Sequence, residues 1–212
     1  LSIFLGLADA MPDVKFAAVP TWGTTEEDMA ALKSRPNVTL LNPVDDMDEL
    51  LARAKVVLIP SVWAEARSRM ALESLARGVP VLAADSGGLR EAMCGVPYLL
   101  PVNPVKRYLP RVDEHMVPVP EVPPQDVGPW VAALRSLLTD RAHYESIARQ
   151  SREAAFEYLE RLTPRAFERC LHEVIARPRV SRTHAAPSIQ AKLNLLSEDR
   201  KRLLEIRIRQ SE

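Results

Sequence analysis

The chain of 212 residues contains only two cysteines, four histidines and seven glycines. Cys94 and Cys170 lie far apart and lack the spacing of metal ligands. We therefore expect both to be small, buried apolar residues within helices, and we expect no metal site. Lysine and arginine together number 28, as do aspartate and glutamate. A net charge of zero argues against nucleic acid or an anionic membrane as the main partner.

Long apolar runs and targeting signals are also missing. No segment approaches the roughly 20 uninterrupted apolar residues of a membrane span. Leu1 leads directly into a helix pattern without the charged start and apolar stretch of a signal peptide, which predicts a cytoplasmic protein. Because no methionine stands at position 1, we expect the sequence to start inside a longer polypeptide. The absence of G-x-G-x-x-G and G-x-x-x-x-G-K-[ST] argues against a dinucleotide-dependent oxidoreductase and a P-loop ATPase.

Short apolar segments alternate with amphipathic helix patterns over roughly the first hundred residues. Five strands are expected, at Val14–Val19, Asn37–Leu41, Lys55–Pro60, Val79–Ala83 and Tyr98–Leu100. The helices expected around them are Phe4–Met11, one opened by a capping box of Thr24 and Glu27, Met47–Ala54, Arg69–Arg77 and Gly88–Cys94. The alternation predicts βαβ units, and hence an α/β fold built on a single doubly wound, Rossmann-like parallel sheet.

The rest of the chain has a different composition. Residues 101–125 contain seven prolines and predict an extended connection over the surface, followed by helices at 126–139, 140–160 and 163–176. A basic, proline-broken stretch from residue 177 predicts a linker, and a charged amphipathic helix follows at 195–210. The expected division is therefore an α/β domain with closing helices at 1–176, a linker at 177–194 and a connector helix at 195–212.

Two carboxylates stand where the expected sheet would bind a ligand. In an open parallel sheet, ligands bind outside the carboxyl ends of the strands. Glu65 lies in the loop after strand 55–60, and Glu73 follows eight residues later, about one turn into the next helix. Both can face the mouth of one cleft, where a helix N-terminus suits a diphosphate and carboxylates suit sugar hydroxyls. The alternative is that Glu73 is an ordinary solvated helix residue.

The loop after strand 79–83 contains the pair Gly87 and Gly88. Adjacent glycines permit positive φ and a close approach of the backbone to a ligand. An ordinary strand-to-helix turn would have the same composition, so the pattern alone leaves both interpretations open.

Three motifs follow one another in this part of the chain: Glu65 with the Glu73-Ser74 pair, G-x-P-V at 78–81, and G-G-x-x-E at 87–91. In this order and spacing, the stretch PSVWAEARSRMALESLARGVPVLAADSGGLREAM resembles the signature of the glycogen-synthase-like family of retaining, GT-B-fold glycosyltransferases. The run DELLARAKVVLIPS and the helical segment VPVPEVPPQDVGPWVAALRSLLTDRAHYESIARQSREAA match as well, so the resemblance covers about residues 1–176. It implies the C-terminal, nucleotide-sugar-binding half of a GT-B fold.

The resemblance implies roles for the two carboxylates. Glu73 would bind the ribose diol of a nucleoside diphosphate sugar. Glu65, the candidate catalytic residue, would contact the hydroxyls of the transferred sugar. The reaction would move that sugar, a hexose in the type of enzyme implied, to an unknown acceptor with retention at the anomeric carbon.

The resemblance also implies a binding place for the diphosphate. Backbone N–H groups of Arg67, Ser68 and Arg69 would hold it, and Gly87 and Gly88 would line the cleft. Such enzymes usually need no metal, and no D-x-D pair stands at a strand end here, so no cofactor is expected beyond the nucleotide-sugar co-substrate.

Two features depart from the family pattern. Family members commonly have a Gly-aromatic-Gly triplet where this chain has Ala66-Arg67-Ser68, so Cβ atoms crowd the phosphate loop while Arg67 adds a positive charge. The family's phosphate-binding Arg and Lys, and its acceptor-binding domain with the catalytic groups, would precede Leu1. The resemblance thus predicts a donor-binding half that needs a missing N-terminal domain as its partner.

The tail LLSEDRKRLLEIRIRQ resembles the short helical connectors between modules of nonribosomal peptide and polyketide synthases, which often read L-S-x-x-x-R-x-L-L. This resemblance implies adjacent synthase modules as partners. It supports a second hypothesis, in which the chain is a non-catalytic, degenerate glycosyltransferase-like scaffold or docking domain of a modular synthase. Any amphipathic helix docked on a neighbour would account for the same residues.

Overall fold

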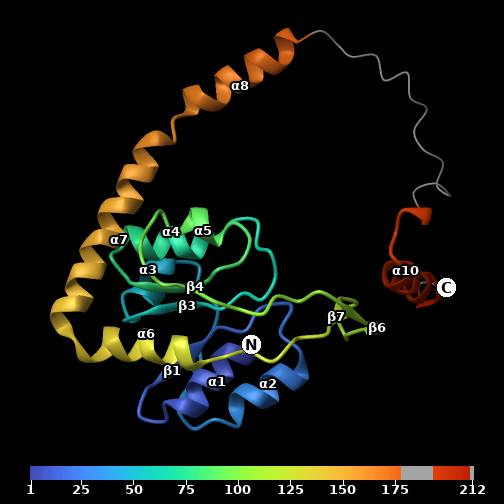
Figure 1. The fold of residues 1–212 in the computed structure, drawn as a ribbon, viewed down its shortest axis with the longest axis horizontal. Helices are drawn as coiled ribbons and strands as arrows, with labels where there is room; N and C mark the ends of the chain where they lie inside the picture. Colours follow the sequence, from blue (N-terminus) through green and yellow to red (C-terminus); the bar gives the residue numbers. More distant parts are fainter. Residues whose placement is uncertain (178–192, 211–212) are drawn as a thin grey trace. The chain divides into compact units, whose positions relative to one another are not determined.

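The computed structural model describes residues 1–177 and 193–210 of the chain (Figure 1). These residues form two compact units. The first consists of Leu1–Lys106 and Val122–Glu157, and the second of Arg107–Glu121 and Tyr158–Glu212. The first unit contains the whole predicted strand–helix alternation. The predicted end of the α/β domain at residue 176 stays a prediction.

The first unit opens with two parallel strands and their helices. Its first elements are α1 (Ser2–Ala10), β1 (Phe16–Ala18), α2 (Glu26–Lys33) and β2 (Val38–Leu40). The two strands pair in parallel. Asn37, just before β2, fixes the turn between α1 and β1, because its side-chain amide donates to the carbonyls of Ala8, Met11 and Val14 at 2.9–3.2 Å.

The capping box of α2 lies one residue later than predicted. Thr25 Oγ1 accepts from the N–H of Asp28, and the Asp28 carboxylate accepts from the N–H of Thr25, both at 3.1 Å. The hydroxyl of Thr24 is engaged elsewhere, accepting from the N–H of Thr21 at 2.9 Å. The prediction of Thr24 with Glu27 is therefore wrong by one residue, because the neighbouring turn takes the first threonine.

The second set of elements carries the predicted site. It comprises α3 (Met47–Leu51), β3 (Val57–Ile59), α4 (Arg69–Ala76), β4 (Val81–Ala84), α5 (Leu89–Ala92) and β5 (Leu99–Leu100). Both β3 and β5 pair with β4 in parallel. Every residue of β4 is buried, as expected for a strand covered on both faces.

The strands confirm the predicted α/β fold with parallel pairing, but hydrogen bonds join them in two sections. One section is β1–β2 and the other is β3–β4–β5. Figure 1 shows α1 and α2 on one side of the strands and α4 and α5 on the other. Layers of helices on both faces are the arrangement of a doubly wound fold.

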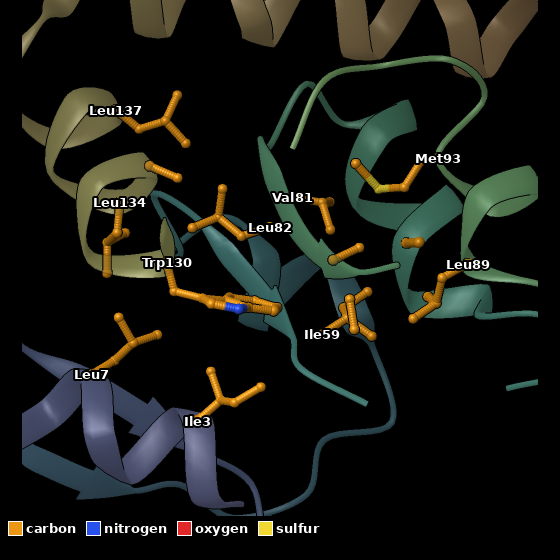
Figure 2. Close-up of a cluster of buried hydrophobic side chains, with 14 of the residues drawn as sticks. Ile3, Leu7, Ile59, Val81, Leu82, Leu89, Met93, Trp130, Leu134 and Leu137 are labelled. Carbon is orange, nitrogen blue, oxygen red and sulfur yellow. The ribbon is translucent and has the colours of Figure 1, made fainter. Parts of the chain in front are cut away.

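A tryptophan fills the centre of the core. The first unit ends with α6 (Gly128–Thr139) and the first part of α7 (Arg141–Arg161). Trp130 of α6 is fully buried, and its indole N–H donates to the carbonyl of Pro101 at 3.3 Å. In Figure 2, Trp130 lies between Leu7 of α1 and Leu82 of β4, whereas the adjacent Val81 points to the opposite face.

The proline-rich segment is more ordered than predicted. Within it, β6 (Tyr108–Val112) and β7 (Pro118–Pro120) form an antiparallel hairpin. The Asp113 carboxylate closes the turn by accepting from the N–H groups of His115 and Val117, both at 2.9 Å. The prediction of a purely extended connection over 101–125 is therefore wrong for these residues.

The C-terminal helices belong to the second unit. They are α8 (Pro164–Ala176) and α10 (Glu198–Gln210), so the last helix begins three residues later than predicted. Leu203 of α10 is buried, and Arg207 donates to the carbonyl of Met116 in the hairpin turn at 2.7 Å. Most of the predicted linker 177–194 lies outside the described residues.

The two cysteines differ from the prediction of buried helical residues. Cys170 is exposed on α8. Cys94 is half-buried and lies just beyond α5 with a φ of 51°, outside the helical region. The helical pattern around Cys170 was predicted correctly, but its face of α8 is not covered within the described residues.

Candidate functional site

The predicted site residues lie on two loops that leave the same edge of the sheet. The loop from β3 to α4 carries Glu65, Arg67 and Ser68, and the loop from β4 to α5 carries Gly87 and Gly88. Because β3 and β4 are parallel, their carboxyl ends lie at one edge and the two loops are neighbours.

Two hydrogen bonds join these loops. The N–H of Gly88 donates to the carbonyl of Glu65 at 2.6 Å, and the Ser86 hydroxyl donates to the carbonyl of Trp63 at 2.5 Å. Ser86 is buried, so its bond to Trp63 is shielded from water. The backbone around Glu65 is therefore held from the β4 side.

The glycine pair makes this approach possible. A Cβ on Gly88 would lie 2.0 Å from the carbonyl oxygen of Ala66, and one on Gly87 would lie 2.4 Å from that of Glu65. Gly87 also has a φ of +55°, which side-chain-bearing residues rarely adopt. The two glycines thus allow the backbone of the β4–α5 loop to pack closely against the backbone of the β3–α4 loop.

Glu65 is held at its carboxylate as well as at its backbone. Its side chain is half-buried, and its Oε2 accepts from the Ser61 hydroxyl at 2.7 Å. Ser61 was not singled out from the sequence. A small hydroxyl residue directly after a strand and four residues before the acid was the available signal. The result is an acceptor group held at the carboxyl end of β3.

Ser68 forms the N-terminal cap of α4. It is 4% exposed, and its Oγ accepts from the N–H of Ala71 at 3.3 Å. The cap leaves the first-turn N–H groups before Ala71 without an intrahelical acceptor. The partial positive charge of the helix N-terminus is therefore directed toward the sheet edge that carries Glu65.

Glu73 lies in the second turn of α4 and pairs with Arg69 at 3.1 Å. The Arg69 side chain is 91% exposed and that of Glu73 is 28% exposed. An exposed pair four residues apart on a helix contributes only about 0.3–0.5 kcal/mol, so little free energy opposes its opening. Arg67 is also exposed, which places two guanidinium groups around the start of α4.

A further ion pair and a thiol flank the site. Arg90 of α5 donates to both carboxylate oxygens of Asp85 at 2.7 and 2.6 Å, across the glycine loop. Burial raises the pKa of the Cys94 thiol, and the positive charge of Arg67 partly opposes that rise. Asp85 and Arg90 stood in the motif region, but sequence reasoning did not assign them a role.

The structure places all seven predicted residues on the two loops and α4. It joins Glu65 to Gly88 and Arg69 to Glu73 directly. A single cleft shared by Glu65 and Glu73, and contact of either with a ligand, stay predictions.

Within residues 1–177 and 193–210, no group of three or more His, Cys, Asp and Glu residues could hold a metal ion. In the same part of the chain, no helix combines the length and apolar character needed to cross a membrane.

Solved structures with a similar arrangement of elements include a bacterial glycosyltransferase. A glycosyltransferase from Rickettsia africae shares 16% identity at a TM-score of 0.54, over 74% of this chain and 38% of its own. Anabaena HepE, solved with UDP and glucose, shares 18% identity at a TM-score of 0.56, over 73% of this chain and 39% of its own. The GtfA/B complex shares 17% identity at a TM-score of 0.56, over 81% of this chain and 32% of that one.

The family model described as group 1 glycosyl transferases matches residues 5–140. The chain therefore belongs to the group 1 glycosyltransferase family. Comparison with curated protein sequences gave no significant match. The chain spans less than two fifths of the length of the structural neighbours named above.

Proposed function

We propose that this chain is the nucleotide-sugar donor-binding half of a retaining glycosyltransferase, which an N-terminal acceptor-binding domain completes. The observation that carries the proposal is the joined pair of loops at the carboxyl ends of β3 and β4. They hold Glu65 at its backbone and its carboxylate, three residues before Ser68, which caps α4. Ligands of open parallel sheets bind at this edge.

The chemistry of the edge suits a nucleoside diphosphate sugar. First-turn N–H groups of α4 and the guanidinium groups of Arg67 and Arg69 would neutralise the diphosphate. Glu73 would leave its weak pair with Arg69 and accept hydrogen bonds from the ribose diol. Glu65, held by Ser61, would accept from hydroxyls of the transferred sugar. The UDP and glucose named for the Anabaena structure make UDP the first nucleotide to try.

The proposed reaction breaks the bond between the anomeric carbon and the diphosphate oxygen. The acceptor hydroxyl forms the new bond on the same face of the sugar and passes its proton to the leaving diphosphate oxygen. Positive groups beside the leaving diphosphate stabilise the charge that develops on it. The acceptor and the groups that bind it would belong to the N-terminal domain, so the chain alone should bind a donor without transferring sugar.

Calorimetric titration of the chain with UDP, ADP, GDP and dTDP tests the proposal. We expect one of them to bind with a dissociation constant on the order of 0.1–1 mM. Glu73→Gln should weaken that binding about tenfold, the equivalent of one charge-assisted hydrogen bond of about 1.5 kcal/mol. Glu153→Gln, an exposed change on α7, should leave it unchanged.

Three outcomes would count against the proposal. Absence of binding by all four nucleotides would favour the second hypothesis, a non-catalytic scaffold of a modular synthase. Equal nucleotide affinity of Glu73→Gln and the unchanged chain would show that Glu73 takes no part in nucleotide binding. Sugar transfer by the chain alone would contradict the need for an N-terminal domain.

A further inference from the structure

The hairpin of β6 and β7 lacks donors at its paired positions. Tyr108 pairs with Pro120 and Val112 with Pro118, with an irregularity between the two pairs. A proline has no N–H group, so β7 offers no donor to the ladder at either position. A two-stranded hairpin is at best marginally stable in water even with a complete ladder. The hairpin therefore needs a covering element.

The covering element in this chain is α10. Helix α10 contacts β6, and its Leu203 is 8% exposed whereas the adjacent Leu204 is 38% exposed. Ile206 is half-buried as well. Leu203, Ile206 and Arg207 are three and four residues apart, so they lie on one face of the helix. That face is docked on the hairpin, and the opposite face is exposed.

Arg207 binds the hairpin turn in a conformation that needs support. Met116 has a φ of 60°, which a residue with a bulky side chain rarely adopts. Its carbonyl accepts from Arg207 at 2.7 Å, and its N–H donates to the carbonyl of Asp113 at 3.0 Å. A strained backbone persists only where the surrounding contacts hold it. The turn and the docked helix therefore stabilise each other.

The two ends of the hairpin are fastened at the sheet edge that carries the candidate site. Because β3, β4 and β5 are parallel, the segment after β5 leaves from the same edge as the loop of Glu65. Asn103 and the Gln125 side chain exchange hydrogen bonds at 2.8 and 2.9 Å. Between Asn103 and β6, the N–H of Val105 donates to the carbonyl of Val62 at 2.9 Å. Val62 lies three residues before Glu65, so this bond joins the hairpin connection to the candidate site.

We propose that the hairpin is a docking surface for α10, and that docking restrains the loop of Glu65. The docked helix holds the turn and its two strands, and β6 follows Val105 closely in the chain. Release of α10 frees the hairpin and weakens the bond from Val105 to Val62. The C-terminal helix thus controls how rigidly the candidate site is held. This inference goes beyond the proposed function and does not depend on which ligand the site binds.

Hydrogen exchange measured at single amides of the chain 1–212 tests the proposal. Leu203→Ser places a hydroxyl in the docked face, and Leu204→Ser makes the same change at the exposed neighbour as a matched control. In Leu203→Ser, the amides of Asp113 and Met116 should exchange at least about tenfold faster, because their hairpin opens more often. The amide of Val105 should exchange at least about threefold faster. Leu204→Ser should leave all three rates unchanged.

Arg207→Ala provides a second variant with an unchanged apolar face. It removes the bond to the carbonyl of Met116, and the Met116 amide should exchange about fivefold faster, with a smaller rise at Val105. Arg200→Ala, at an exposed position of the same helix, should have no effect. The amide of Ala83, which donates to a carbonyl within the sheet, should keep its rate in every variant.

Three outcomes would overturn the proposal. Unchanged exchange of Met116 in both Leu203→Ser and Arg207→Ala would show that α10 does not hold the hairpin. Equal effects of Leu203→Ser and Leu204→Ser would show that no particular face of α10 is docked. Faster exchange in the hairpin with an unchanged rate at Val105 would show that docking does not restrain the loop of Glu65. The comparison uses no nucleotide, so a failure of the proposed function would leave its result intact.

Discussion

Replacing Gly88 with alanine tests the joined loops from which the site is built. The new Cβ would lie 2.0 Å from the carbonyl oxygen of Ala66, against an ordinary contact of 3.4 Å or more, so one loop must move by about 1 Å or more. That movement also breaks the 2.6 Å hydrogen bond from Gly88 to Glu65. Overpacking of about 1–3 kcal/mol and a lost bond of about 1 kcal/mol give a destabilisation of about 2–4 kcal/mol.

Thermal unfolding followed by circular dichroism measures this effect. A loss of about 2–4 kcal/mol lowers the midpoint by about 5–15 °C in a protein of this size. Gly23→Ala is the matched control, because a Cβ there meets no atom within 4 Å and φ is not positive. Gly95→Ala isolates backbone strain, since φ is +81° with no atom within 4 Å, and should cost only about 1–2 kcal/mol. A Gly88→Ala midpoint within about 2 °C of the Gly23→Ala midpoint would refute the loop packing.

Two further predictions concern the turn before β1 and the thiols. Asn37→Ala should lower the unfolding free energy by about 1–3 kcal/mol in chemical denaturation, because three backbone carbonyls lose their donor, whereas exposed Asn42→Ala should have little effect. An equal loss in both variants would contradict the role of Asn37. A thiol reagent should label exposed Cys170 first, and labelling of Cys94 should become efficient only at higher pH, because burial raises the pKa of its thiol. Faster labelling of Cys94 than of Cys170 near neutral pH would show that its environment is open.

Sequence periodicity predicted the type of almost every element in the first hundred residues, because the strands are short apolar runs between amphipathic helices. Element ends were less predictable. Two adjacent threonines compete for the cap of α2, and the choice of Thr25 depends on the turn that engages Thr24. The predicted single sheet also appears as two hydrogen-bonded sections, since the pattern along the chain does not show which strands are adjacent.

The hairpin of β6 and β7 was not predicted, because its strands contain prolines and a proline-rich sequence is not typical of β-strands. Pro110, Pro118 and Pro120 lie within its strands and lack the N–H groups of a ladder. A two-stranded hairpin tolerates them, since each strand has a free edge to which such positions can face.

The loops of the candidate site were predicted, but their connection was not. Glu65 and Gly88 are far apart in sequence, and only the parallel pairing of β3 with β4 brings their loops together. The bond from Ser61 to Glu65 is local, and a serine four residues before an acid is too common to indicate it. The exposure of Cys170 depends on what covers α8, which no local pattern encodes.

Residue-resolved nuclear magnetic resonance titration of the ¹⁵N-labelled chain with UDP tests the central claim most directly. We predict progressive, saturable shifts of the amides of Arg67–Met70 and of Gly87 and Gly88, with little change at Glu153 on α7. Glu73→Gln should reduce these shifts at equal UDP concentration. Shifts confined to other residues, or none at any of these amides with any of the four nucleoside diphosphates, would contradict a donor site at the carboxyl ends of β3 and β4.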